Sequence, residues 1–214
     1  MKNIQNIRTD YVKGELSMED LEASPGKQLS KWIQDAITAK ALDVNAFCLS
    51  TVNSEGYPRG RNVLVKGIDE ESIVFYTNKN SSKAVDISAN PKAGSTFFWP
   101  ELERQVCIYG EVSELTEKEN DEYFASRPRE SQIGAWVSKQ SQPLDSRGEL
   151  DSTLEEVREK YRGHDVIDRP AHWGGYRIHF EKVEFWQGRP SRLHDRIIYT
   201  KGDEGVWHKG LLQP

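Results

Sequence analysis

Residues 173–188 read WGGYRIHFEKVEFWQG and have the pattern of a β-strand with one interruption. Apolar side chains occupy even positions up to Phe180 and odd positions from Val183 onward. Successive side chains of a strand point to opposite faces of the sheet, so this change of parity requires an extra residue or a bend. The sequence therefore predicts a β-bulge or bend near Glu181–Lys182.

Other strand-like segments lie on both sides of this stretch, with turn residues between them. Five precede it: AFCLSTVN (46–53), RGRNVLVKGI (59–68), SIVFYTN (72–78), GSTFFWPEL (94–102) and RQVCIYGEVSEL (104–115). A hairpin that turns at Gly202–Gly205 follows it and closes the chain. This meander-like spacing predicts an antiparallel β-barrel.

Helices are expected at four places. Ser24 and Pro25 are typical of a helix start, and an amphipathic pattern follows. Thr116 and Glu119 form a capping-box sequence, which predicts a helix that ends at Pro128. Shorter helices are predicted over 130–138 and 149–161. The predicted fold is thus mainly β with peripheral helices, as one domain over 1–214 whose first 16 residues form a mobile arm.

Composition limits the classes of function. The 214 residues are 36% hydrophobic and 29% charged, with a formal net charge of −5, which argues against bulk nucleic-acid binding. No apolar run is long enough to cross a membrane, and the N-terminus lacks a signal-peptide core. Cys48 and Cys107 are expected to be buried free thiols in a cytoplasmic protein. No cysteine–histidine cluster has the spacing of a zinc site.

Three clusters combine cations with hydroxyl groups, amides or aromatic rings. In the first, Ser81 can cap a helix whose N-terminus, together with Lys83, would attract an anion; an ordinary helix cap is the alternative. In the second, Tyr123 and Arg127 are four residues apart on one expected helix face and Ser131 is one turn on, which suits a phosphate monoester; a solvated helix end is the alternative.

The third cluster is WQGRPSRLHDR, residues 186–196. If this stretch is extended, Arg192, His194 and Arg196 share one face behind Trp186. A solvated charged surface is the alternative. No nucleophile elbow, zinc-protease motif or dinucleotide fingerprint accompanies these clusters, so the sequence favours an enzyme that takes its reactivity from a cofactor.

The order of the motifs RNVLVKG, FYTN, LERQV, YFASRPRESQIGAWVSKQS, WGGYRI and EFWQGRPSRLHDR resembles the pyridoxamine/pyridoxine 5'-phosphate oxidase family. The likeness runs from about Arg8 to the C-terminus. It implies a split β-barrel homodimer that binds FMN at the subunit interface. It also implies oxidation of pyridoxamine or pyridoxine 5'-phosphate to pyridoxal 5'-phosphate by hydride transfer from C4', with O₂ as the final acceptor and H₂O₂ as a product.

The resemblance also assigns expected roles to individual residues. The expected FMN contacts are Arg61, Asn62, Val63, Leu64, Val65, Lys66, Tyr76, Thr77, Ser82, Lys83, Gln105, Gln140, Ser141, Trp186 and Arg196. The expected substrate contacts are Arg8, Tyr11, Lys66, Tyr123, Arg127, Ser131, Arg192 and His194. Arg192 and His194 are the expected catalytic pair at the substrate ring, Arg8 and Tyr11 belong to a covering segment, and no metal is implied.

Two positions depart from the family pattern. The family has SRK where this chain has Ser81-Ser82-Lys83, so one phosphate-binding arginine is replaced by Ser82, which predicts weaker FMN binding. The C-terminal RLAP of the family is Leu211-Leu212-Gln213-Pro214 here. Two alternatives remain: a related FMN-dependent oxidase of another planar metabolite, of the phenazine-pathway type, and a protein that binds FMN or pyridoxal 5'-phosphate without turnover.

Overall fold

The computed structural model describes residues 3–6 and 10–214. The helices are α1 (Pro25–Thr38), α2 (Ser82–Ala89), α3 (Glu117–Ser126), α4 (Arg129–Val137) and α5 (Arg147–Lys160), with short 3₁₀ turns at Ile4–Asn6, Met18–Asp20 and Pro190–Arg192. The strands are β1 (Ala46–Val52), β2 (Pro58–Leu64), β3 (Gly67–Ile68), β4 (Ser72–Asn78), β5 (Lys92–Trp99), β6 (Arg104–Glu114), β7 (Trp173–Gln187), β8 (Asp195–Lys201) and β9 (Trp207–Leu211).

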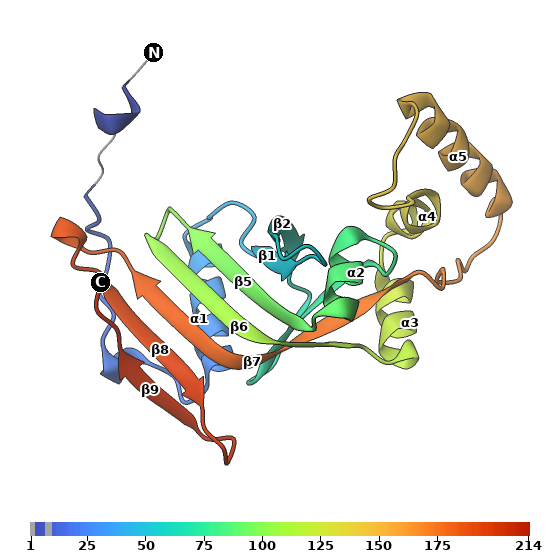
Figure 1. The fold of residues 1–214 in the computed structure, drawn as a ribbon. Helices are drawn as coiled ribbons and strands as arrows, with labels where there is room; N and C mark the ends of the chain where they lie inside the picture. The colour runs from blue at the N-terminus through green and yellow to red at the C-terminus, as the bar shows by residue number, and fades with distance from the viewer. Residues whose placement is uncertain (1–2, 7–9) are drawn as a thin grey trace.

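All of these strands belong to one curled antiparallel sheet (Figure 1). The strand order is β2-β1-β5-β6-β7-β4-β3, and β8 and β9 continue from β7. The first half of β7 pairs with β4, the second half pairs with β8, and β6 pairs with both halves. β7 therefore joins two parts of the sheet, which confirms the prediction of an antiparallel split barrel with peripheral helices.

The predicted bulge in β7 is confirmed. Tyr109 pairs with Lys182, whereas the next residue of β6, Gly110, pairs with Phe180, so Glu181 has no partner on β6. The backbones are close at this point: a Cβ on Gly110 would lie 1.9 Å from the carbonyl oxygen of His179. The bulge keeps apolar side chains on the core face along both halves of the strand, which is why their parity changes in the sequence.

Helix α1 covers the core face of the sheet (Figure 1). Ser24 caps it by accepting a hydrogen bond from the backbone N–H of Lys27, as the sequence predicts. Trp32 of α1 is buried, and its ring meets that of Phe185 edge-on with centroids 5.1 Å apart. An aromatic ring of this size removes a large apolar area from water, so this contact anchors α1 on β7.

A smaller core forms where α3, α4 and α5 project beyond one end of the sheet (Figure 1). Its buried members include Phe124, Ile133 and Trp173, and Leu154 and Val157 of α5 pack against them. The Thr116–Glu119 capping box is present. No helix in the described part of the chain is long and apolar enough to span a membrane.

Two expectations need correction. The stretch 186–196 is not extended throughout, because Ser191 (φ 58°) and Arg192 (φ 64°) adopt left-handed backbone conformations and β8 begins only at Asp195. The strand alternation assumed for Arg192 and His194 is therefore wrong. Cys48 and Cys107 are free thiols, as predicted, but each is only partly buried, because both lie on the face of the sheet opposite the core.

Candidate active site

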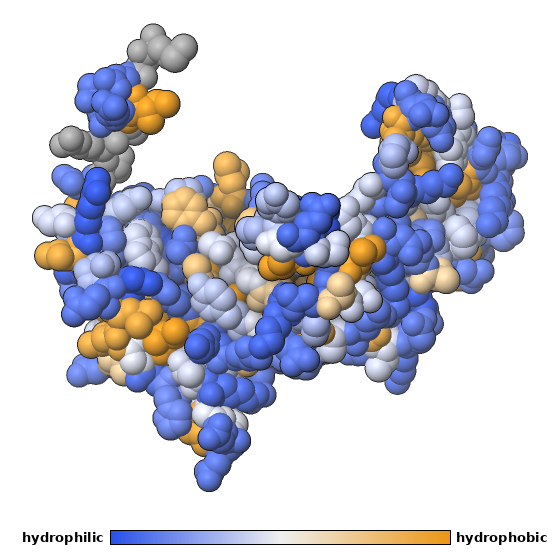
Figure 2. Space-filling view, viewed as in Figure 1, coloured by the Kyte–Doolittle hydropathy of each residue, from blue (hydrophilic) through white to orange (hydrophobic). Residues whose placement is uncertain are grey.

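A cavity of about 720 Å³ lies between β2, β4 and the N-terminal end of α2 on one side and α3 and α4 on the other. The surface is hollowed there, beside the projecting helices (Figure 2). Fourteen of the predicted site residues line it: Arg61, Asn62, Val63, Leu64, Lys66, Tyr76, Thr77, Ser82, Lys83, Tyr123, Arg127, Ser131, Gln140 and Ser141. Val65 does not, because its side chain is buried in the main core.

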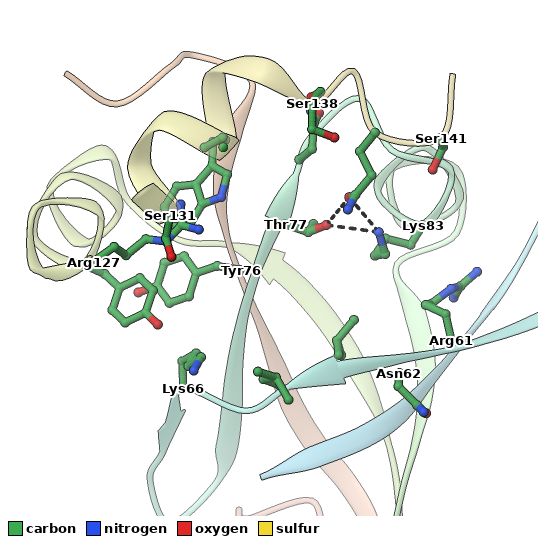
Figure 3. A pocket seen from close by; sticks show the side chains of 18 of the residues that line it. Arg61, Asn62, Lys66, Tyr76, Thr77, Lys83, Arg127, Ser131, Ser138 and Ser141 are labelled. Carbon is green, nitrogen blue, oxygen red and sulfur yellow. Dashed lines mark hydrogen bonds between the residues drawn. The ribbon is translucent and has the colours of Figure 1, made fainter. Parts of the chain in front are cut away.

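One end of the cavity, here called the Lys83 end, contains Arg61 and Lys83 (Figure 3). Ser82, whose backbone N–H contacts Ser141, belongs to the same end. The Lys83 ammonium group is buried and donates to three neutral oxygens, Thr77 Oγ1 at 3.1 Å, Ser81 Oγ at 3.2 Å and Gln140 Oε1 at 3.0 Å. Burial, with a smaller contribution from the charge of Arg61, lowers the pKa of Lys83 to about 8. A buried cation with neutral partners is a favourable place for an anion.

The helix that begins at the Lys83 end differs in detail from the prediction. Ser81 occupies the N-cap position of α2, but its hydroxyl makes no capping hydrogen bond to the helix backbone and instead accepts from Lys83. The backbone N–H of Ser82 donates to Ser141 Oγ at 3.2 Å. The loop after α4 therefore contacts the first turn of α2, which brings Gln140 and Ser141 to the same end of the cavity as Lys83.

The opposite end, here called the Arg127 end, contains Lys66, Arg127 and Ser131 (Figure 3). Tyr123, stacked on Tyr76, belongs to the same end. The Arg127 guanidinium lies over the ring of Trp173, 4.6 Å from its centroid. Its Nη1 atom is buried and makes no hydrogen bond within the described chain. Burial lowers the pKa of Arg127, which nevertheless stays charged because a guanidinium keeps its proton under all ordinary conditions. A buried guanidinium with an unused donor is suited to bind an anion, so this end of the cavity too favours an anionic group.

The Arg127 end is assembled across a break between two helices. Tyr123 lies in α3, but α3 ends at Ser126, and Arg127 has an extended backbone (φ −73°, ψ 148°). The expectation that Tyr123 and Arg127 share one helix face with Ser131 a turn further on is therefore wrong. Pro128 is the cause, because the residue before a proline disfavours helical geometry. Ser131 lies in the first turn of α4. Because of the break, Arg127 and Ser131 both line the cavity together with Tyr123.

Three aromatic rings form a stack beside Arg127. The rings of Tyr76 and Tyr123 are stacked with centroids 3.9 Å apart, and those of Tyr76 and Trp173 lie 5.1 Å apart, at interplanar angles of 14° and 8°. Gly175 makes room for this arrangement, since a Cβ there would lie 2.6 Å from the ring of Tyr76. The stack fixes the wall from which Tyr123 and Arg127 extend, at little entropic cost because aromatic side chains have few rotamers.

The remaining predicted cofactor residues lie elsewhere, in a transverse row on the outer face of the sheet. Gln105 on β6 is paired with Trp186 on β7, and Trp186 is paired with Arg196 on β8. Directly paired residues project from the same face, so these three side chains form one row. None of them lines the cavity, and Figure 1 shows β8 beside the C-terminal half of β7 and α4 beyond the opposite end of that strand. The Arg196 guanidinium is held by Glu184 at 2.7 and 3.0 Å, and this hydrogen bonding raises its pKa.

His194 and Tyr11 contact this row. Their rings form a cluster with that of Trp186. The ring centroids of Trp186 and His194 are 4.7 Å apart. The centroid of the Tyr11 ring lies 5.6 Å from that of Trp186 and 5.7 Å from that of His194. Nδ1 of His194 accepts a hydrogen bond from the backbone N–H of Arg189 at 3.1 Å, so the neutral ring carries its proton on Nε2. Arg192 lies in the adjacent 3₁₀ turn, and Arg8 lies outside the described residues.

Sequence reasoning missed several residues of the cavity wall: Asn78, Gly134, Ala135, Ser138 and Trp173. Trp173 is the important omission, because it supports both the aromatic stack and Arg127. Its position at the start of the WGGYRI motif was visible, but the sequence alone gave no signal that α3 would pack against it. No group of histidine, cysteine and acidic side chains suited to a metal ion occurs among the described residues.

Comparison with known proteins agrees with the fold. Residues 33–161 match the family model described as pyridoxamine 5'-phosphate oxidase, and residues 173–214 match the pyridoxine 5'-phosphate oxidase C-terminal dimerisation region. The chain is 46% identical to the pyridoxine/pyridoxamine 5'-phosphate oxidase of Paraburkholderia phytofirmans, with both chains covered completely. It is 47% identical to the enzyme of that name from Cytophaga hutchinsonii, with 99% of each covered.

Solved structures extend the comparison to the fold. PhzG of Burkholderia lata, determined with tetrahydrophenazine-1-carboxylic acid, superposes with a TM-score of 0.85 at 28% identity over 92% of this chain and 95% of that one. An FMN-binding protein of Nostoc punctiforme related to pyridoxamine 5'-phosphate oxidase superposes with a TM-score of 0.72 at 16% identity, covering 91% and 100% of the two chains. The family match and the full-length identity establish that the chain belongs to the pyridoxamine 5'-phosphate oxidase family.

Proposed function

We propose that this protein oxidises pyridoxamine 5'-phosphate and pyridoxine 5'-phosphate to pyridoxal 5'-phosphate with FMN as its cofactor. The observation that carries the proposal is the buried Nη1 atom of Arg127, which makes no hydrogen bond within the described chain. A guanidinium in this state needs an anionic partner, and a second cation with neutral partners, Lys83, lies at the other end of the cavity. Two phosphate-bearing molecules, cofactor and substrate, account for both ends.

The residues present fit FMN. The Lys83 end combines two cations with the N-terminus of α2, a favourable site for a phosphate group, and the cavity volume is in the range of small-molecule sites. Arg61, Ser82, Lys83 and Ser141 would hold the FMN phosphate, and Thr77 and Gln140 would position Lys83. FMN supplies hydride acceptance from C4' of the substrate and re-oxidation by O₂ with release of H₂O₂.

The Arg127 end holds the substrate phosphate. Arg127 donates from a planar fork, Lys66 adds a compact positive charge, and Tyr123 and Ser131 add neutral donors. Trp173 keeps the Arg127 guanidinium in place by stacking against it. These contacts catalyse by positioning, since they fix the phosphate and thereby the distance of the reacting carbon from the cofactor end.

We infer that the active site is completed across a homodimer. The dimerisation region contributes Trp186 and Arg196, which project from the outer face of the sheet, and His194, whose ring packs against Trp186; none of the three lines the cavity of its own chain. Phe98 is 53% exposed and is paired with Gln105, and Tyr109 on the same face is 48% exposed. Apolar exposure of this extent beside the row favours burial against a second copy of the chain.

In the completed site, Trp186 and Arg196 of one subunit contact the flavin held by its partner, while Arg192 and His194 lie at the substrate ring. His194 acts there as a hydrogen-bond donor through Nε2, since Nδ1 is occupied by the Arg189 amide. Tyr11 contacts both Trp186 and His194 and forms part of a cover that keeps water out. Arg8 remains a proposed member of that cover.

The activity is tested with purified protein and pyridoxine 5'-phosphate in air. We expect bound flavin absorbance, formation of pyridoxal 5'-phosphate and an equal amount of H₂O₂. A protein that binds flavin but forms neither product would be a carrier and not an oxidase. Turnover of a phenazine precursor without turnover of pyridoxine 5'-phosphate would favour an FMN-dependent oxidase of the phenazine-pathway type. The 28%-identical PhzG structure contains such a ligand, tetrahydrophenazine-1-carboxylic acid.

The shared site is tested by mixing two impaired variants, Arg127→Gln in the cavity and Arg196→Gln in the outer row, and assaying them at a substrate concentration well below the wild-type KM and at limiting FMN. After unfolding and refolding together, about half of the dimers carry one subunit of each kind, and each such dimer has one intact site of two. We expect about one quarter of wild-type activity to return. The same treatment of either variant alone is the control, and no recovery in the mixture would show that each site lies within one chain.

A further inference from the structure

Asp86 on α2 is a buried carboxylate that the proposed chemistry does not use. Asp86 is only 3% exposed, and its Oδ2 atom accepts a hydrogen bond from Thr51 Oγ1 at 2.7 Å. Burial acts to raise the pKa of Asp86, but hydrogen bonds from Arg59 and Thr51 and the nearby positive charges lower it below its usual value. The carboxylate is therefore ionised and fully engaged by its neighbours.

Two arginines of β2 converge on this carboxylate. Arg59 binds it through Nε, 3.1 Å from Oδ2, and through Nη2, which contacts Oδ1. Arg61 lies farther away, with Nη2 3.8 Å from Oδ2, and is oriented by Thr51, to whose Oγ1 its Nη1 donates at 2.7 Å. The two arginines are two residues apart on one strand and so point to the same side.

Arg59 lies beside the position where the resembling family has an arginine. Its Nη2 donates to the backbone carbonyl of Ser82 at 3.3 Å, which places the guanidinium group next to the first residue of α2. Its side chain is 38% exposed, so it is accessible to a ligand despite its bonds to Asp86. A guanidinium group thus lies directly behind Ser82, which lines this end of the cavity, although Arg59 itself is not among the lining residues.

The charges at this end match those of a phosphate monoester. Arg59, Arg61 and Lys83 together with Asp86 give a net charge of two positive while Lys83 is protonated. A phosphate monoester carries nearly two negative charges at neutral pH. Without Arg59 the net charge would be one positive, and Asp86 would repel the phosphate with only Arg61 nearby to balance it.

We propose that Arg59, positioned by Asp86, supplies to the FMN phosphate the guanidinium charge that Ser82 lacks. This rests on the proposed function, because it takes the Lys83 end as the phosphate site of the cofactor. It also replaces the expectation of weak FMN binding. The family carries this guanidinium on the first turn of α2, whereas this chain carries it on strand β2, at Arg59.

The test measures dissociation constants of FMN and riboflavin by quenching of flavin fluorescence in the flavin-free protein. Riboflavin lacks the phosphate, so it reports the rest of the site. We expect Arg59→Gln to weaken FMN binding about tenfold and to change riboflavin binding less than about twofold. Arg158→Gln is the matched control, because it removes the same charge from α5, which lies away from α2 (Figure 1). Within the described residues, Arg158 pairs with the exposed Glu130 and Glu155.

A double-mutant cycle separates replacement of the missing arginine from a general charge effect. Ser82→Arg should change FMN affinity less than about twofold in the wild-type protein but restore about tenfold in the Arg59→Gln protein. Equal tightening in both backgrounds would show that Arg59 does not serve in place of an arginine at residue 82. Equal weakening of riboflavin and FMN by Arg59→Gln would assign Arg59 a purely structural role and overturn the proposal.

Asp86→Asn provides a second, independent test. Loss of a negative charge by itself would tighten phosphate binding, whereas loss of the group that holds Arg59 would weaken it. We expect FMN affinity to fall several-fold with riboflavin affinity unchanged, and tighter FMN binding would contradict the positioning role. A wild-type protein that binds FMN no better than riboflavin would instead contradict the proposed cofactor site itself, so the two failures are distinguishable.

Discussion

Lys83 is expected to make FMN binding depend on pH. Its ammonium group is buried against Thr77, Ser81 and Gln140, none of which carries a charge. Burial and the charge of Arg61 lower its pKa to about 8 from the ordinary lysine value of 10.5. In the flavin-free protein Lys83 is therefore mostly charged at pH 7 and mostly neutral at pH 9.

The size of the effect follows from this pKa. The charged fraction of Lys83 falls about tenfold between pH 7 and pH 9. Bound phosphate favours the charged form, so FMN binding above pH 8 must be accompanied by uptake of a proton. The phosphate itself does not titrate in this range, since its second pKa is near 6. We therefore expect FMN affinity to fall about tenfold from pH 7 to pH 9.

The assay is titration of the flavin-free protein with FMN at pH 7, 8 and 9, followed by flavin fluorescence. Riboflavin should show no such decrease, because its binding does not involve a phosphate. Lys83→Arg should abolish the pH dependence, since a guanidinium keeps its proton throughout. A wild-type affinity for FMN that is constant from pH 7 to pH 9, or a decrease of the same size in Lys83→Arg, would refute the reasoning.

Four further outcomes are expected. Arg127→Gln should raise the KM for pyridoxine 5'-phosphate about 30-fold, from the loss of about 2 kcal/mol of charged hydrogen bonding, and leave FMN affinity unchanged in a fluorescence titration. Glu184→Gln should weaken FMN binding several-fold by releasing Arg196, whereas an unchanged dissociation constant would separate Arg196 from the flavin. Phe98→Glu should convert the dimer to a monomer in light scattering, because it places a charge in the outer apolar face. Gly110→Ala should lower the free energy of unfolding in urea by about 3 kcal/mol, since its Cβ would overlap a backbone oxygen of β7; a change below about 1 kcal/mol would contradict the close packing at the bulge.

Local features of the fold could be predicted from local sequence. The cap at Ser24, the capping box at Thr116 and the bulge beside Lys182 each depend on residues close together in the chain. Such features are set by backbone hydrogen bonding and by the two-residue period of strands, which short patterns record. Their agreement with the structure follows from that locality.

Predictions that assumed a regular element across a break were wrong. Tyr123 and Arg127 were expected on one helix face, but Pro128 ends the helical geometry one residue earlier than the spacing implies. Arg192 and His194 were expected on one strand, but left-handed backbone at Ser191 and Arg192 turns the chain before β8. In both places the prediction used the residue spacing of a regular helix or strand at positions where the backbone has left that helix or strand.

The sequence by itself determined the family, the antiparallel fold and most of the residues that line the cavity, because long ordered motifs identify residues without their coordinates. Only the tertiary structure separated those residues into a cavity and a row on the outer face, placed Trp173 under Arg127, and brought Arg59 to Ser82. These contacts join residues distant in the chain, and their distances depend on the packing of whole strands and helices. Sequence motifs identify the side chains that a site uses, whereas the packing of strands and helices determines which of these side chains are in contact.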